Sequence, residues 1–526
     1  MARAIGIGNQ DFEKIRQEGY FYIDKTRFIQ DWWDTGDSVT LITRPRRFGK
    51  TLNMSMVEKF FSVDYADRGE LFQGLAIWEN EKYRGLQGRF PVLFLSFADI
   101  KETTFEEARK KICMLIQLVY NKFDFLLESD VLNENEKRDF RQISSDAENS
   151  IVSLSLKILS GYLCRYYGKK VIILLDEYDT PMQEAYIEGY WEELAGFTRN
   201  LFNSTFKTNP YLERAVMTGI TRVSKESVFS DLNNLTVVTT TSGKYADCFG
   251  FTEEEVFAAL EEFGLSDRRQ QVKDWYDGFT FGGRKDIYNP WSIVNYLQEK
   301  RVGAYWVNTS GNGLVGKLIR EGRLADQQIF ERLLCGEAVN MEIDEEIIYN
   351  QLFTKKNAVW SLLLASGYLK VTDITFTERT GRTSYDLELT NKEVRIMFEE
   401  MVRDWFSGND AYNNFIQALL HHDIQAMNIC MNKVTSEMFS FFDTGKGSQG
   451  GEPERFYHGF ILGLMVELSD RYVITSNREM QLKRASSFGR YDLMLEPRNA
   501  SEDAVIMEFK VHDEEKRNFP IRCRRH

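Results

Sequence analysis

The stretch VTLITRPRRFGKT, residues Val39–Thr51, decides the fold of the N-terminal part of this chain. Its first five residues are β-branched or apolar and predict a buried strand. A short turn follows and ends in Gly49-Lys50-Thr51, and the next residues, Leu52–Phe61, have the periodicity of a helix. This succession of a strand, a short loop and a helix is the context that a phosphate-binding loop requires.

The expected chemistry of the loop follows from its position at the start of a helix. Backbone N–H groups at a helix N-terminus bind phosphate oxygens, while the lysine contacts the β and γ oxygens and the threonine binds Mg²⁺. The pattern G-x-x-x-x-G-K-[ST] requires glycine where this chain has Arg44, so the loop alone does not decide whether a nucleotide binds. The predicted nucleotide-binding residues are Arg46, Arg47, Phe48, Gly49, Lys50 and Thr51.

Composition limits the class of protein. The 526 residues exceed what one hydrophobic core holds, so several domains are expected. The formal net charge of −13 argues against a histone-like nucleic-acid binder but leaves room for a locally basic channel. No apolar run reaches the roughly 18 residues of a membrane span. Six scattered cysteines without a C-x-x-C pair, and no signal-peptide core, predict a reduced, cytoplasmic protein without a zinc site.

Four more apolar runs resemble the strand that precedes the loop. They are continuous rather than alternating, as strands of a parallel sheet covered on both faces must be. Helical segments separate them, so residues 1–245 are predicted to form one α/β domain with a P-loop NTPase sheet of the ASCE type. The runs are Phe90–Phe97, Lys170–Asp179, Arg214–Ile220 and Leu235–Thr240.

Two carboxylates end the third strand in chain order. Asp176 is placed to hold Mg²⁺ through water, and Glu177 to orient and deprotonate the attacking water. The fourth strand is expected to lie between the strands of the loop and of Asp176, so that its Thr218 touches the γ-phosphate or that water. Arg222 is placed to contact phosphate in cis or in trans. The alternatives are a solvated acidic turn for the carboxylates and a surface position for Arg222.

Several aromatic segments have a structural explanation. Gly19–Thr26 is expected to pack against the first sheet. The helix-rich region 246–375 contains three clusters of aromatics with Gly, Asn or Pro, and we expect these to form packed corners. The clusters are Trp275–Phe279, Tyr288–Ser292 and Tyr305–Ser310.

A second carboxylate set lies near the C-terminus. Glu508 and Lys510 are two apart on a predicted strand and therefore share one face. Asp492 on the neighbouring strand is expected to converge with them, its carboxyl group within about 6 Å of that of Glu508, to hold a divalent cation such as Mg²⁺. Lys510 would position the hydrolytic water. Glu479 is a further ligand candidate or a surface residue.

Taken together, these motifs resemble the AAA-ATPase-like family of prokaryotic proteins. The resemblance implies a P-loop domain followed by a PD-(D/E)XK nuclease-like domain, and the family tolerates arginine at the position of Arg44. It leads us to expect an AAA-ATPase-like domain at 1–245, a helical middle region at 246–375 and a restriction-endonuclease-like domain at 376–526. The segments that carry it are Gly19–Thr26, Arg44–Leu52, Leu174–Thr180, Thr218–Asn234, Trp275–Phe279 and Tyr288–Trp291.

The end of the chain departs from this family pattern. After Val511 the family continues into a helix and a strand, but His512–His526 has no apolar helical stripe. The expectation is a truncated nuclease core in which Val505 and Met507 are exposed or are covered by a partner.

Two functions remain open at this point. The first is an ATPase coupled to a Mg²⁺-dependent nuclease-like module that acts on DNA or RNA. A homo-oligomer is a possible form of such a protein. The second is a nucleotide-switched interaction protein with slow ATPase turnover and a C-terminal domain that binds without cutting. The intact set of Asp492, Glu508 and Lys510 favours the first, and the short C-terminus favours the second.

Overall fold

The computed structural model divides the chain into two compact units. The first contains residues 1–309 and 340–393, and the second contains residues 310–339 and 394–526. Neither 245 nor 375 is a boundary between these units. The structure describes residues 2–222, 228–229, 232–309, 313–320, 324–345, 352, 355–406, 410–442, 460–461, 463–476, 479–480, 489–490, 493–509 and 521–524.

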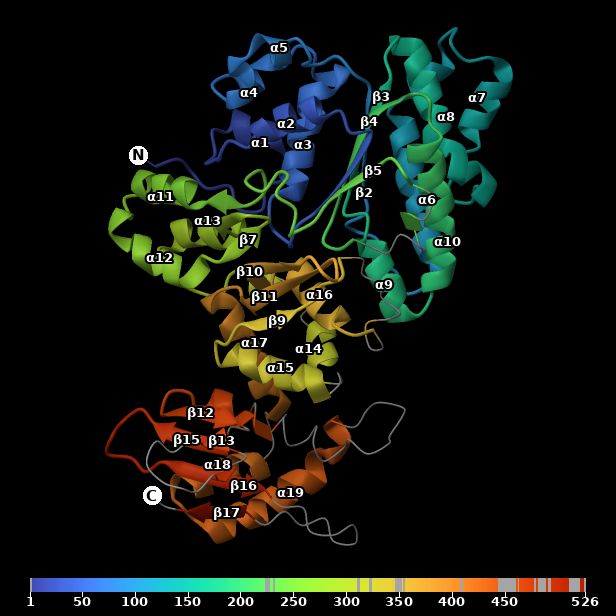
Figure 1. The fold of residues 1–526 in the computed structure, drawn as a ribbon. Coiled ribbons are helices and arrows are strands. Elements are labelled where there is room, and N and C mark those ends of the chain that lie inside the picture. Colours follow the sequence, from blue (N-terminus) through green and yellow to red (C-terminus); the bar gives the residue numbers. More distant parts are fainter. Residues whose placement is uncertain are drawn as a thin grey trace. The chain divides into compact units, whose positions relative to one another are not determined.

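A five-stranded parallel sheet forms the centre of the first unit (Figure 1). Its order is β2-β3-β4-β1-β5, so β4 lies between β1 and β3 as the sequence predicts. All residues of β1 and β3 are buried, which agrees with a sheet covered on both faces. The strands are β1 (Val39–Thr43), β2 (Val92–Ser96), β3 (Val171–Asp176), β4 (Leu212–Gly219) and β5 (Leu235–Val238).

Helices cover both faces of this sheet (Figure 1). On one face, Trp32 of α2 and Phe60 of α3 belong to the same buried cluster as Ile42 and Ile172 of the strands. Tyr22 packs against this cluster, as expected for the segment Gly19–Thr26. The helices of this face are α1 (Phe12–Gln17), α2 (Arg27–Thr35), α3 (Lys50–Phe61), α4 (Ala76–Glu79) and α5 (Glu81–Arg84). Those of the other face and its surroundings are α6 (Phe105–Asn121), α7 (Glu134–Arg141), α8 (Asn149–Tyr167), α9 (Thr180–Glu188) and α10 (Trp191–Phe202).

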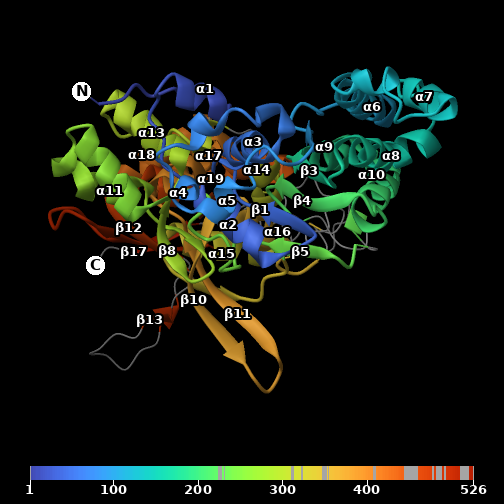
Figure 2. The same cartoon turned by 90° about the horizontal axis from the view of Figure 1, so that it is seen from above.

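The rest of the first unit holds two small sheets and their helices. The sheet β6-β8-β7 packs with helices that bury Tyr276, Tyr288 and Tyr296 in a second core. In the sheet β10-β11-β9, the hairpin β10–β11 extends outward (Figure 2). The elements are β6 (Phe251–Thr252), α11 (Glu253–Glu262), α12 (Arg269–Tyr276), β7 (Phe279–Phe281), β8 (Arg284–Tyr288), α13 (Pro290–Glu299), β9 (Val339–Met341), α16 (Ala358–Ala365), β10 (Leu369–Thr377) and β11 (Arg382–Leu389). Helix α17 (Lys392–Phe406) begins at the end of this unit.

An antiparallel sheet of order β12-β15-β16-β17 lies in the second unit. Its strands are β12 (Tyr472–Ser476), β15 (Leu493–Pro497), β16 (Val505–Phe509) and β17 (Ile521–Arg524), beside the pair β13 (Glu479–Met480) and β14 (Gly489–Arg490). Its helices include α14 (Gly313–Arg320), α15 (Leu324–Leu334), α18 (Asp410–Leu420) and α19 (Ile424–Phe442).

Two expectations about the end of the chain are wrong. The tail contributes a strand, because β17 pairs with β16 through Glu508 and Arg522. Val505 and Met507 are 7% and 0% exposed rather than uncovered. Their cross-strand partners Leu495 and Leu493 are buried as well, so one face of this sheet contributes to a core.

Candidate functional site

The loop between β1 and α3 has the backbone of a helix-capping turn. Gly49 is the N-cap of α3 with φ of 78°, a left-handed conformation that glycine adopts without a steric penalty. Arg47 also has a positive φ, 65°, although it carries a side chain. Arg44 is not among the residues with a positive φ, so the position at which the P-loop pattern expects glycine does not require one.

A pocket of about 500 Å³ lies over this loop. This volume is within the range of small-molecule and cofactor sites. The N-terminal segment 5–10 contributes to one part of its lining, and Glu177 and Thr180 contribute to another. The predicted loop residues Arg46, Arg47, Phe48, Gly49, Lys50 and Thr51 all line it.

Lys50 is held at the base of the loop. Its side chain is nearly buried, at 5% exposure, and Nζ donates to the carbonyl oxygens of Arg44 (3.0 Å) and Pro45 (2.9 Å). Burial lowers the pKa of Lys50, whereas Glu177, Asp176 and Asp179 act in the opposite direction. Two neutral carbonyl oxygens therefore fix the position of the ammonium group, and three nearby carboxylates favour its charged form.

The P-loop threonine and the strand-end aspartate meet directly. Thr51 Oγ1 donates to Asp176 Oδ2 at 2.7 Å, and Thr218 Oγ1 donates to the other oxygen of that carboxylate. Asp176 is fully buried, and burial raises its pKa while the two hydroxyls lower it. A hydroxyl and a carboxylate at this separation are oxygen ligands of the kind that Mg²⁺ prefers. The residues present thus fit the expected cation.

Glu177 follows this strand in a left-handed conformation, with φ of 50°. Its N–H donates to Thr218 Oγ1 at 3.3 Å, and its carboxylate accepts from Thr180 Oγ1 at 3.2 Å. Glu177 lines the pocket, but Thr218, which is fully buried, is not among the described residues that do. In this structure the Thr218 hydroxyl contacts the carboxylate of Asp176 and the backbone N–H of Glu177, and its contact with a γ-phosphate or a water stays a prediction.

Asp179 is a site-supporting residue that the sequence reasoning did not assign. Its carboxylate is buried and accepts from the N–H groups of Ile220 (2.9 Å) and Thr221 (2.8 Å) and from Thr221 Oγ1 (2.9 Å). Burial raises its pKa, and these donors oppose the rise. Asp179 therefore ties the turn after β3 to the end of β4. The motif L-D-E-Y-D-T-P contained the signal, a third acidic residue close to the strand end.

Arg44 acts as a buried brace. Its guanidinium is fully buried and donates to the carbonyl oxygens of Thr43 (2.9 Å), Thr239 (2.7 Å), Lys244 (3.3 Å) and Tyr245 (3.4 Å). Burial lowers the pKa of Arg44 to about 10. These contacts connect the start of the loop to the segment that follows β5. The glycine that the P-loop pattern has at this position has no side chain and makes no such contacts.

Arg222 lies at a different cavity. This cavity of about 20 Å³ is lined by Thr239, Glu345 and Ser361 among others, and Arg222 is not among the described residues that line the P-loop pocket. The structure does not bring Arg222 to the predicted phosphate site.

All three aromatic clusters contact the P-loop, the first through Phe279, whose ring lies 4.8 Å from that of Phe48 between ring centres. They form packed corners, as predicted, but the loop is part of what they pack on. Asn289 Nδ2 and Trp306 Nε1 both donate to the carbonyl oxygen of Arg46, at 3.3 and 3.0 Å. The guanidinium of Arg47 lies over the ring of Trp291, 4.4 Å from its centre. Sequence reasoning missed these residues because the contacts join positions far apart in the chain.

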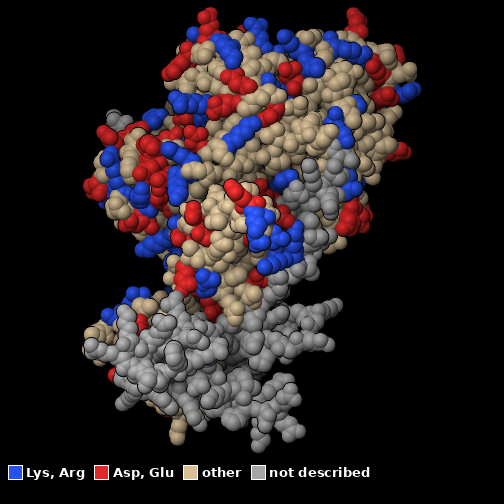
Figure 3. Space-filling model, viewed as in Figure 1, with Lys and Arg blue, Asp and Glu red and all other residues tan. Residues whose placement is uncertain are grey.

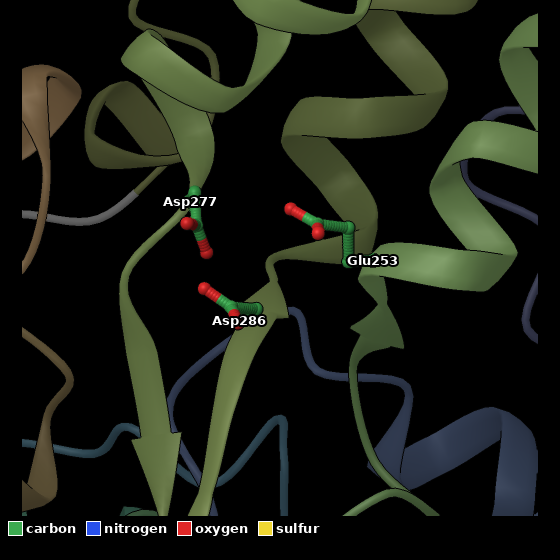
Figure 4. Close-up of side chains that lie close together, drawn as sticks. All are labelled: Glu253, Asp277 and Asp286. Atoms are coloured by element: carbon green, nitrogen blue, oxygen red, sulfur yellow. The ribbon is translucent and has the colours of Figure 1, made fainter.

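Glu253, Asp277 and Asp286 form an acidic cluster within the first unit, with one oxygen of each within 4.8 Å of the others (Figure 4). Lys273 Nζ lies 2.5 Å from Glu253, 3.8 Å from Asp286 and 3.9 Å from Asp277, so an ammonium group already balances part of the charge. Burial and the neighbouring carboxylate of Asp286 raise the pKa of Asp277 to about 7. At neutral pH the carboxyl group of Asp277 is therefore partly protonated.

The surface of the first unit shows no single-sign field on the face seen in Figure 3. Acidic and basic side chains alternate over it. The excess of negative charge in the sequence is thus distributed rather than gathered there.

The predicted nuclease residues are only partly described. Asp492 and Lys510 lie outside the described residues. Glu508 is in β16 and Glu479 is in β13, but their side chains are not among those described. The backbone supports the expected neighbourhood, because β15, which begins directly after Asp492, pairs with β16. The predicted approach of Asp492 and Glu508 to within about 6 Å stays a prediction.

Comparisons with known families agree with this arrangement. Residues 6–229 match the family described as predicted AAA-ATPase, and residues 452–520 match the PD-(D/E)XK nuclease superfamily. The chain carries an AAA-ATPase-like domain and a PD-(D/E)XK nuclease superfamily domain.

A similar protein is known from Azotobacter chroococcum mcd 1 under the name "Uncharacterized protein in vnfD 5'region". It is 27% identical over 403 residues, which cover 76% of this chain and 69% of the relative. That name states no activity. Among the described residues of the present chain, no helix has both the length and the apolar character that a membrane crossing needs.

The acidic cluster predicts a pH dependence of stability. A raised pKa in the folded state means that Asp277 contributes stability at low pH, which is lost as the pH rises through about 7. In Asp277→Asn the amide donates to Asp286 in place of the proton. We expect the melting temperature of this variant to fall less than that of the wild type between pH 5.5 and 8.5, measured by differential scanning fluorimetry. Asp274→Asn in α12, the helix that Asp277 caps, is the control, and parallel curves for all three proteins would contradict the raised pKa of Asp277.

Proposed function

We propose that the first unit binds ATP with Mg²⁺ and hydrolyses it. The observation that carries the proposal is the 2.7 Å contact between Thr51 and Asp176, which come from the P-loop helix and from the end of β3. In P-loop NTPases the residues at these two positions hold the magnesium ion of the nucleotide. Thr51 and Asp176 would hold it here, and Mg²⁺ supplies neutralisation of the charge on the phosphate oxygens.

The remaining residues have separate roles in this proposal. The backbone of the loop and the ammonium group of Lys50 bind the phosphates. Lys50 leaves its two carbonyl acceptors for the phosphate oxygens, since a charged acceptor makes a stronger hydrogen bond than a neutral one. Glu177 orients the attacking water and accepts its proton. Thr218 and Thr180 keep the two carboxylates in place, through the hydrogen bonds to Asp176 and Glu177.

For the second unit we propose Mg²⁺-dependent action on DNA or RNA. The support is the superfamily match at 452–520 together with the adjacent strands β15 and β16, which carry or flank Asp492, Glu508 and Lys510. Two carboxylates would hold the cation, and the lysine would position the hydrolytic water. A protein of this kind acts in the cytoplasm, where both ATP and Mg²⁺ are available.

Removal of the P-loop lysine tests nucleotide binding. Lys50→Ala loses the charge that faces the phosphates, so ATP affinity should fall about tenfold or more. Isothermal titration calorimetry with ATP and Mg²⁺ measures this. Lys110→Ala, an exposed lysine of α6, is the matched control and should bind like the wild type. Equal affinity in Lys50→Ala and the wild type would show that the P-loop assignment is wrong.

The role of Glu177 is tested by an isosteric change. Glu177→Gln keeps the size of the side chain and can still accept from Thr180, but its amide does not take a proton. ATP affinity should remain, whereas phosphate release should fall about a hundredfold or more. Glu184→Gln in α9 serves as the control. Unchanged turnover in Glu177→Gln would return Glu177 to the alternative of a solvated acidic turn.

Cutting of nucleic acid is a separate test. The wild type should nick plasmid DNA or cleave single-stranded RNA with Mg²⁺ and not with EDTA, and Glu508→Ala should lose this activity by about a hundredfold or more because a carboxylate ligand is removed. Glu496→Ala, on the neighbouring strand β15, is the control. Binding of nucleic acid without cutting by the wild type would favour the nucleotide-switched interaction protein.

A further inference from the structure

The region after residue 280 hydrogen-bonds to the P-loop at the carbonyl oxygen of Arg46. This oxygen accepts from Trp306 Nε1 at 3.0 Å and from Asn289 Nδ2 at 3.3 Å. Trp306 and Asn289 are 3% and 1% exposed, and neither is among the described residues that line the pocket. Any effect of these two side chains on a nucleotide must therefore pass through the loop.

The Arg46 carbonyl belongs to the same peptide unit as the N–H of Arg47. In a planar trans peptide these two groups point in opposite directions. Two donors on the carbonyl thus fix the direction of the N–H, which is a phosphate donor in the proposed site. Arg47 also has φ of 65°, a conformation that a residue with a side chain keeps only when its surroundings hold it.

Trp306 is in turn held by a buried carboxylate. Glu393, which is fully buried, accepts from the backbone N–H of Trp306 at 2.5 Å and from Ser292 Oγ at 2.8 Å. Burial raises the pKa of Glu393 to about 7, against the lowering effect of Ser292 and of the backbone of residues 305–307. Each oxygen of this buried carboxylate thus has a donor, and the bond to Trp306 fixes the backbone from which the indole extends.

The ring of Trp306 is fixed by packing. It lies edge-on to Phe279 at 5.4 Å and tilted against Tyr368 at 5.6 Å between ring centres. Phe279 also packs on Phe48 of the P-loop, at 4.8 Å. The indole N–H is therefore aimed by contacts on both its backbone and its ring, and these contacts do not depend on the hydrogen bond itself.

From this geometry we propose that Trp306 and Asn289 are positioning residues of the nucleotide site and that Glu393 holds Trp306 in place. They orient the Arg46–Arg47 peptide so that its N–H faces the phosphates. The inference rests on the proposed nucleotide binding and extends it to residues outside the P-loop domain of the family match, which ends at residue 229.

Trp306→Phe tests the proposal because the phenyl ring keeps contacts with Phe279 and Tyr368 but has no N–H. Loss of one hydrogen bond that orients a phosphate donor should weaken ATP affinity about five- to tenfold. The contact acts equally in the ground state and the transition state, so KM for ATP should rise by the same factor while kcat stays within about twofold. A purely structural role would instead lower kcat and the melting temperature together.

A second variant keeps the test decisive if Trp306→Phe folds poorly. Asn289 also caps α13, where its Oδ1 accepts from the N–H groups of Trp291 and Ser292. Asn289→Ser preserves a capping oxygen but is too short to reach Arg46, and it should raise KM in the same way. Trp275→Phe is the matched control, because that half-buried tryptophan makes no described hydrogen bond to the loop.

The outcomes separate the two proposals. Calorimetry with ATP and Mg²⁺ is carried out first on the wild type and on Lys50→Ala. If the wild type does not bind ATP, both the proposed function and this inference are overturned. Binding by the wild type with unchanged affinity and KM in both Trp306→Phe and Asn289→Ser overturns the inference alone. Weaker binding in either variant with unchanged kcat and melting temperature, and no change in Trp275→Phe, supports it.

Discussion

The parallel pairing of β3, β4 and β1 is the constraint on which the nucleotide site depends. Parallel strands end at the same edge of a sheet, so the loop after β1 and the carboxylates after β3 meet there. Thr51 and Asp176 are 125 residues apart in the chain and 2.7 Å apart in space. The intervening strand β4 carries Thr218 as its last residue but one, and the Thr218 hydroxyl contacts Asp176 of the neighbouring strand. A register shift of one residue would turn these side chains to the opposite face.

The loop itself is held from two sides by contacts to backbone carbonyls. Arg44 reaches the segment after β5, while Asn289 and Trp306 reach the Arg46 carbonyl from the region that follows the sheet. Neutral carbonyls accept from both terminal nitrogens of the buried guanidinium, its Nε has no partner among the described residues, and burial lowers the pKa of Arg44. The residues that hold the Arg46 carbonyl come from late in the first unit, whose two stretches end at Thr309 and Glu393. Trp306 lies three residues before Thr309, and Glu393 is the residue that binds the Trp306 N–H. The geometry of the P-loop is therefore a property of the whole first unit rather than of the motif.

Three charged groups are buried at the proposed phosphate site. Lys50, Asp176 and Asp179 are each less than 6% exposed, and each has at least two hydrogen-bond partners. Charged groups at such depth are stable only when they are paired or fully hydrogen-bonded. In the acidic cluster, by contrast, burial and then the neighbouring carboxylate of Asp286 raise the pKa of Asp277 to about 7.

The sequence by itself determined the five strands, the loop and the carboxylates, because continuous apolar runs and the spacing of G-K-T and D-E are local patterns that the backbone must follow. It also indicated the strand order around Thr218. Only the tertiary structure decided that Asn289 and Trp306 hydrogen-bond to the loop and that Asp179 connects the turn after β3 to the end of β4. It also decided that β17 pairs with β16. These features depend on contacts between distant segments, for which residue type and local spacing carry no signal. The burial of Val505 and Met507 belongs to the same class, because side-chain burial in a sheet is decided by what packs on it and not by the strand's own sequence.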